Sequence, residues 1–178
     1  EFLVLRDANW FTDFPTSVEW IEYLYSYSRA HSVDGVIAID QHVAVELLKV
    51  LGPIRVEDVS FDITDKNVLE YMRAAKEARP PGTTSRWDRK QFISRMAKPL
   101  LEKVLNARGA TWSKLAPVLI KLLDERHILL QFDDSETTNL LERRKWDGAV
   151  RPPQDSDYLM IVDSNIGFNK SNASLSTS

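Results

Sequence analysis

The sequence predicts an α/β protein, built as a single layered domain in which a mixed, mainly parallel β-sheet is flanked by helices. Short apolar runs of strand length alternate along the chain with longer segments whose apolar residues recur at steps of three and four. The 178 residues suffice for one hydrophobic core, and 43% hydrophobic with 28% charged residues is typical of a globular domain. We expect this domain to span residues 1–165 and a polar C-terminal tail to span residues 166–178.

The first half of the chain predicts two strand–helix units. Thr16 and Glu19, just after Pro15, fit a capping box, in which a hydroxyl and a carboxylate bond the free amides of a first helical turn. Gly52 and Pro53 end a later helix, because glycine favours the position after a helix and proline cannot continue one. The expected elements are a strand over residues 2–5, a helix over residues 16–29, a buried strand over residues 33–39 and a helix over residues 41–51.

The second half predicts mostly helices, with short strands between them. The Arg-Pro-Pro-Gly sequence of residues 79–82 breaks the chain between two helices. Pro99 and Pro117 each remove a backbone donor, so we expect a kink or a late start in the helices that contain them. The expected elements are a strand over residues 54–56, helices over residues 66–78, 86–107 and 112–126, a strand over residues 127–132, a helix over residues 135–144 and a strand over residues 158–162.

Composition narrows the classes of function. The net charge of -3 provides no overall field for a phosphate backbone, so we expect no nucleic acid partner. The absence of cysteine excludes disulfides and thiolate zinc sites, and three histidines without paired spacing leave carboxylates as the candidate metal ligands. The five tryptophans are scattered, which favours packing roles over a carbohydrate-stacking platform.

Targeting signals are not evident in the sequence. The chain contains no apolar run of about 18 or more residues and no secretory signal peptide. It opens on Glu1, in what we interpret as a strand already in progress. We therefore expect a soluble piece of a longer protein.

The start of the helix expected from residue 86 carries an unusual set of basic residues. On a helical projection Arg86, Arg89 and Lys90 continue an apolar stripe. The stripe consists of Ile93, Ala97, Leu100 and Val104. Cations at a helix N-terminus oppose the helix dipole, and a bound phosphate or pyrophosphate would relieve that conflict. The alternative is that these long side chains extend to solvent or pair with neighbouring acidic residues.

Arg6 and Asp7 form a second candidate site, because ligands of α/β sheets collect beyond the carboxyl ends of strands. Arg6 could contact a phosphate, and Asp7 could hold a metal ion or act as a base; the alternative is a salt bridge at the strand end. Asp40 follows another predicted strand, where we favour a helix N-cap. Asp13 is likewise interpreted as a turn or cap residue.

Several sequence blocks resemble the bacterial domain of unknown function 4012 family, over nearly the whole chain. The blocks are residues 6–10, 13–15, 33–40 and 51–53, and the stretch from residue 157 to residue 170. That family in turn looks like a distant relative of the LytR-CpsA-Psr enzymes. These transfer glycopolymers from polyprenyl-pyrophosphate carriers to peptidoglycan outside the membrane, using magnesium and a set of arginines.

The resemblance implies a LytR-CpsA-Psr-like fold and assigns roles to the candidate residues. Arg6-Asp7 is similar to an Arg-Asp pair whose arginine meets the pyrophosphate, and residues 86–91 look like an Arg-x-x-Arg-Gln helix start. Here Lys90 stands where the glutamine would follow, and Gln91 comes one residue late. The strand that bears the metal-binding aspartate of those enzymes precedes the matched region and is absent from this sequence.

The leading hypothesis is therefore a membrane-anchored, extracytoplasmic cell-envelope domain related to glycopolymer phosphotransferases. Arg6, Arg86, Arg89 and Lys90 would bind a lipid-linked pyrophosphate, and Asp7 would act as a catalytic base or as a ligand of magnesium. Arg6 and the Arg86 helix start would then share one anion. The alternative is a non-catalytic envelope module that binds a glycan, an anionic lipid head group or a partner protein.

Overall fold

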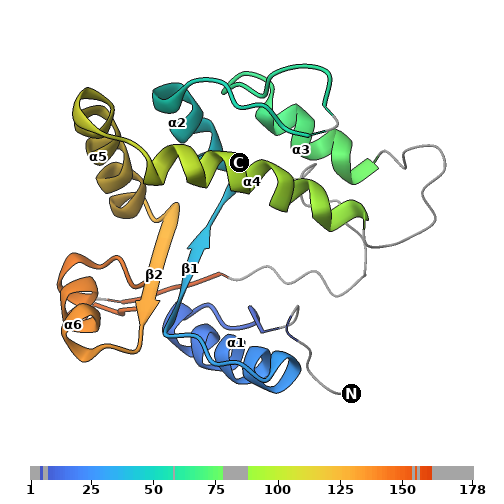
Figure 1. Cartoon of the computed structure of the whole chain (residues 1–178). Coiled ribbons are helices and arrows are strands. Elements are labelled where there is room, and N and C mark those ends of the chain that lie inside the picture. The colour runs from blue at the N-terminus through green and yellow to red at the C-terminus, as the bar shows by residue number, and fades with distance from the viewer. Residues whose placement is uncertain are drawn as a thin grey trace.

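The computed structural model describes residues 5, 8–57, 59–77, 88–153, 155 and 157–161, and at residues 74–77 and 88–92 it describes the backbone alone. Within these residues, six helices accompany a two-stranded sheet (Figure 1). In chain order the elements are α1 (Phe14–Arg29), β1 (Gly35–Ile39), α2 (Gln41–Leu51), α3 (Val68–Glu77), α4 (Asp88–Leu105), α5 (Gly109–Asp124), β2 (Ile128–Phe132) and α6 (Ser135–Arg144). None of the described helices is both long and apolar enough to cross a lipid bilayer.

The sheet of the described residues is antiparallel, so the structure mixes helices and strands as predicted but contains no parallel sheet in this part of the chain. Gly35 pairs with Phe132 and Ile39 with Ile128, and the arrows of β1 and β2 point in opposite directions in Figure 1. The reason lies in the path between the strands. The chain leaves the end of β1 through α2 and returns through α5, which packs against α2, so β2 begins at the end where β1 stopped.

The hydrophobic core lies mainly among α2, α3, α4 and α5, which Figure 1 shows together at one end of the strands. Leu115 and Leu122 of α5 are buried almost completely, as are Ile54 and Ile63, which form an isolated antiparallel bridge. The other two helices pack elsewhere: α1 contacts both strands, and α6 contacts β2. The two strands therefore connect a four-helix layer to a smaller layer of two helices.

Local sequence signals determine several helix ends. The predicted bounds of the helices over residues 41–51 and 135–144 are confirmed by α2 and α6. Helix α1 begins two residues earlier than predicted, because the carboxylate of Asp13 caps it by accepting hydrogen bonds from the Thr16 amide (3.1 Å) and hydroxyl (2.7 Å). The predicted cap role of Asp13 is confirmed, whereas the capping box at residues 16–19 is not formed. Pro99 and Pro117 lie inside α4 and α5, so neither delays the start of its helix.

Three predicted strands differ from the structure or lie outside it. The strand over residues 54–56 is reduced to the single bridge at Ile54. Residues 158–161 have no regular secondary structure, so the last predicted strand is wrong over these positions, where apolar sequence occurs without a partner strand in the described part of the chain. Of the predicted strand over residues 2–5, only residue 5 is described, in a short 3₁₀ turn.

The apolar stripe predicted for α4 is only partly buried. Leu100 lies in the core and Val104 packs against it, as predicted. Ile93 is 47% exposed and Ala97 is also exposed, so the first half of the predicted stripe is not buried among the described residues. The core instead receives Met96, one position round the helix.

The segment after α6 is attached to the start of α1. The Phe14 amide donates to the Gly148 carbonyl (3.3 Å), and the Val150 amide donates to Asp13 Oδ1 (2.9 Å). Asp147 is only 2% exposed and accepts hydrogen bonds from the Arg151 guanidinium. Burial alone would raise the pKa of Asp147, but the hydrogen bonds from Arg151 and the Ala149 amide hold it below its ordinary value. Asp13 therefore serves both as a helix cap and as an anchor for this segment.

Gly148 makes this attachment possible, and its replacement by alanine should destabilise the protein. At a φ of 66°, a Cβ on Gly148 would lie 2.9 Å from Cβ of Phe14 and 2.9 Å from Cδ1 of Leu129. We expect Gly148→Ala to cost about 1–2 kcal/mol for the left-handed backbone and about 1–3 kcal/mol more for the steric conflict. Urea unfolding measures the sum.

The matched control is Gly109→Ala. Gly109 also has a positive φ, of 50°, but an added Cβ would meet nothing within 4 Å. Equal losses of unfolding free energy in the two variants would contradict the steric account.

Candidate functional site

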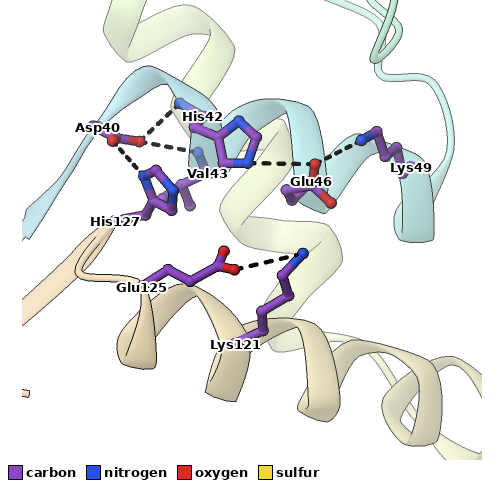
Figure 2. Close-up of polar contacts among 8 residues, drawn as sticks. All are labelled: Asp40, His42, Val43, Glu46, Lys49, Lys121, Glu125 and His127. Atoms are coloured by element: carbon purple, nitrogen blue, oxygen red, sulfur yellow. Dashed lines mark hydrogen bonds and ion pairs between the residues drawn. The ribbon is translucent and has the colours of Figure 1, made fainter.

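A polar cluster lies where β1 ends, and Asp40 is at its centre (Figure 2). Asp40 is the N-cap of α2: its Oδ1 accepts hydrogen bonds from the amides of His42 (2.8 Å) and Val43 (3.4 Å). Its Oδ2 lies 2.6 Å from Nδ1 of His127, the residue before β2. The backbone closes the same corner, because the Asp40 amide donates to the His127 carbonyl (3.2 Å). The predicted cap role of Asp40 is confirmed, and the imidazole is an addition to it.

A second imidazole lies beside the first. The rings of His42 and His127 have centroids 4.5 Å apart and are tilted by 43°. Nε2 of His42 lies 3.5 Å from Oε1 of Glu46, which also pairs with Lys49 at 2.6 Å (Figure 2). Each histidine of the cluster therefore faces a carboxylate, with the two rings adjacent.

The carboxylates of this cluster are held in the charged state. Partial burial would raise the pKa of Asp40, but the hydrogen bonds from His127 and from the α2 amides together keep it below its ordinary value. The hydrogen bond from Lys49 lowers the pKa of Glu46. Since an ionised Asp40 can only accept, Nδ1 of His127 carries the proton of their hydrogen bond.

Such an arrangement suits proton transfer. When the imidazole is neutral and Nδ1 is protonated, Nε2 carries the lone pair and can accept a proton. The His127 side chain is 30% exposed, so a ligand can reach it. Nowhere in the described residues do three or more His, Asp or Glu side chains gather so that they could hold a metal ion.

The residues predicted to bind pyrophosphate are not tested by the structure. Arg6, Asp7 and Arg86 lie outside the described residues. Arg89 and Lys90 lie in the first turn of α4, where only the backbone is described. The shared anion site of Arg6 and the Arg86 helix start therefore stays a prediction.

The structure adds an apolar surface that starts one helical turn after Arg89. Four residues spaced by four positions, all exposed, form this apolar surface of α4: Ile93, Ala97, Leu101 and Leu105. Leu105 also lines a cavity of about 470 Å³, together with Val104, Ala107, Trp112 and Leu119, with Arg108 at its wall. The surface is therefore continuous, along α4, with a mostly apolar cavity at the turn into α5.

Helix α1 carries a different exposed surface. The rings of Phe11 and Trp20 stack with centroids 6.4 Å apart, and Tyr23 meets Trp20 edge-on at 6.2 Å. All three rings are exposed, Tyr23 to 61%. Trp20 is 38% exposed and contacts other exposed rings instead of the core, unlike the predicted packing role, whereas Phe14 of the same helix is buried.

Sequence reasoning missed His42 and His127 as site residues. The available signal was the position of His127 directly before a predicted strand and of His42 directly after the cap Asp40. Their separation of 85 positions in the sequence concealed the contact, because only the antiparallel pairing of β1 with β2 brings the two ends together.

Comparison with known proteins gives one family. The family described as protein of unknown function (DUF4012) matches residues 1–76. No curated protein and no solved structure matches the chain. The predicted resemblance to the unknown-function family is therefore confirmed, over those residues.

Replacing Asp40 by alanine should destabilise the protein more than replacing Asp134, the cap of α6. Both aspartates accept from the first-turn amides of their helices, but only Asp40 also bonds a histidine. Asp40→Ala loses the cap, worth about 1 kcal/mol, and the His127 hydrogen bond in addition. Denaturant unfolding of both variants, and a double-mutant cycle with His127→Ala, measures the second contribution.

The effect of Asp40→Ala should depend on pH with a defined sign. Because the pKa of Asp40 is lowered in the folded state, its stabilisation is fully present above the unfolded value of about 4. It is lost as the pH falls through the folded pKa. A difference between wild type and variant that grew on acidification would contradict this assignment.

Proposed function

We propose, starting from the match of residues 1–76 to the DUF4012 family of unknown function, that the chain is part of a cell-envelope protein that acts on a polyprenyl-pyrophosphate-linked glycan. In this proposal the protein transfers the glycan to peptidoglycan outside the membrane, as the resemblance to the LytR-CpsA-Psr enzymes implies. A membrane anchor elsewhere in the parent protein is part of the proposal.

The observation that carries this proposal is the apolar surface of α4. Exposed apolar side chains cost free energy in water, and those of Leu101 and Leu105 are 56% and 63% exposed. From Arg89 to Leu105 the helix rises about 24 Å, at about 1.5 Å per residue. A long apolar chain laid along this surface would reach the cavity that Leu105 lines. Its head group would then lie at the start of α4.

The charge at that start completes an amphiphilic ligand site. Arg86, Arg89 and Lys90 fall within or just before the first turn of α4, where free backbone amides also favour an anion. A prenyl pyrophosphate combines an apolar chain with such an anion. The alternative, that these basic side chains extend to solvent or pair with neighbouring acidic residues, is not tested, because their side chains are not among those the structure describes.

Magnesium, which the resemblance implies, has no ligand set among the described residues. It stays a prediction tied to Asp7, outside those residues. In this proposal the arginines of this chain bind the pyrophosphate head group directly, without magnesium.

A second candidate function is favoured by the aromatic surface of α1. In a non-catalytic module, the exposed rings of Phe11, Trp20 and Tyr23 would stack against the C–H faces of a glycan. The hydroxyl of Ser17 bonds the Phe11 carbonyl (2.9 Å) and so holds the first ring beside the helix. This candidate needs no residue of α4.

Replacing both Arg86 and Arg89 by alanine should weaken prenyl-pyrophosphate binding without loss of stability. Two charge-assisted hydrogen bonds of roughly 1.5–3 kcal/mol each correspond to at least about a hundredfold in affinity. Calorimetric titration with a water-soluble prenyl pyrophosphate measures the change, and thermal melts measure stability.

The matched control is Lys114→Ala with Arg143→Ala, which removes the same charge from exposed positions of α5 and α6. A wild type that bound no prenyl pyrophosphate, with a large drop in melting temperature in the Arg86 and Arg89 variant, would contradict the proposal. If that wild type bound oligosaccharides, and Trp20→Ala abolished this binding, the non-catalytic module would be the better account.

Replacing Leu101 and Leu105 by serine should weaken binding of a long prenyl chain selectively. Part of each leucine is already buried by the protein, so we expect each substitution to remove about 1 kcal/mol of contact with the prenyl chain. For the pair this corresponds to an affinity about tenfold lower or more. Affinity for inorganic pyrophosphate should stay unchanged. Leu140→Ser on α6, where the leucine is 53% exposed, is the control, and an equal effect of chain length on wild type and variant would refute the role of this surface.

A further inference from the structure

The end of α4 and the turn into α5 expose large apolar side chains beside one another. Leu101 and Leu105 lie one helical turn apart on α4, and Leu105 is 63% exposed. Trp112, in the first turn of α5, is 49% exposed and lines the same mostly apolar cavity as Leu105. We call Leu101, Leu105 and Trp112 the apolar tip. Exposed apolar side chains gathered in this way mark surfaces that meet a partner or a membrane.

Basic side chains lie at the rim of the apolar tip. Lys98 is exposed and precedes Leu101 by three positions on α4, so the two side chains are neighbours on the helix surface. Nη1 of Arg108 donates to the carbonyls of Leu105 (2.9 Å) and Ala107 (2.8 Å). These hydrogen bonds hold the guanidinium at the end of α4, where Arg108 lines the cavity. The rim of the apolar tip is therefore positively charged.

The charge of this part of the chain is opposite in sign to that of the whole. Residues 93–113 contain four basic side chains and one acidic side chain, whereas the chain has a net charge of -3. One of the four, Lys103, is bound elsewhere, because its ammonium donates to the carbonyls of Leu51 (3.0 Å) and Pro53 (2.7 Å). A helix that combines an exposed apolar surface with an excess of basic residues is typical of the interface of an anionic bilayer.

A lipid bilayer matches each part of this surface chemically. The long side chains of Lys98 and Arg108 can extend from the rim to lipid phosphates while the leucines lie among the acyl chains. The amphipathic ring of tryptophan favours the boundary between head groups and acyl chains, and Trp112 lies next to Leu105 at the cavity. Apolar, aromatic and basic groups thus occur together, in the combination that interfacial binding requires.

We propose that the apolar tip docks the protein on the surface of an anionic lipid bilayer, with Lys98 and Arg108 at the lipid phosphates. This inference goes beyond the proposed function and does not rest on it, because it requires no prenyl lipid. The two are compatible, since a lipid-linked substrate lies in a bilayer and the apolar surface of α4 ends in the apolar tip.

The test is co-sedimentation of the chain with lipid vesicles. We expect binding to vesicles of phosphatidylglycerol and phosphatidylcholine, weaker binding at high salt, and little binding to phosphatidylcholine alone. Lys98→Gln with Arg108→Gln should lower the partition coefficient about 10–30-fold, because each basic residue near such a surface contributes about fivefold. Lys66→Gln with Arg143→Gln removes the same charge from exposed positions outside the apolar tip and should stay within a factor of two of the wild type.

A second measurement locates the docking surface on the molecule. Lipids with brominated acyl chains quench tryptophans that enter the bilayer, so the fluorescence of the wild type should fall on binding. Trp112→Phe keeps an apolar ring and should lose most of this quenching, whereas Trp20→Phe on α1 should retain it. Leu105→Ser should weaken vesicle binding about fivefold, and Leu140→Ser on α6 is its control.

A wild type that does not bind anionic vesicles, or equal quenching in the wild type and Trp112→Phe, would overturn the inference. A dimer in vesicle-free solution that Leu105→Ser dissociates would also overturn it, because a second copy of the chain would then cover the apolar tip. Failure on vesicles with intact prenyl-pyrophosphate binding in solution would leave the proposed function standing. Vesicle binding without prenyl-pyrophosphate binding would support the docking surface and contradict the proposed function.

Discussion

The carboxylate of Asp40 joins the elements on which the described part of the fold depends. One oxygen caps α2 and the other holds His127 at the start of β2, while the backbone of the same residue bonds across to β2. Four elements meet there: β1 ends, α2 begins, α5 ends and β2 begins. These side-chain and backbone hydrogen bonds hold together the corner at which the antiparallel strands meet and from which α2 and α5 pack against each other.

This corner also separates the two layers of the molecule. On one side α2 to α5 enclose the core, with Leu115 and Leu122 at its centre. On the other side α1 and α6 lie against the strands, and Asp13 ties the segment after α6 to the start of α1. Each layer thus has one aspartate that both caps a helix and bonds a distant part of the chain: Asp40 in the first layer and Asp13 in the second.

The proposed function uses only the first of these layers. The exposed apolar residues that it uses lie on α4, which packs against α2 and α3. In the second layer, the aromatic rings of α1 offer a glycan surface at a separate place. The two candidate functions therefore use different surfaces, and the comparison of variants on α4 and α1 distinguishes the enzyme from the binding module.

The sequence by itself determined the features that depend on neighbouring residues. The bounds of α2 and α6, the caps Asp13 and Asp40, and the resemblance of residues 1–76 to the unknown-function family were all predictable, because a helix end or a motif is set within a few positions. Only the tertiary structure decided the strand direction, the exposure of Ile93 and the contact of Asp40 with His127. Each of these depends on which distant segment packs alongside, and apolar periodicity reports that a face is apolar without reporting what covers it.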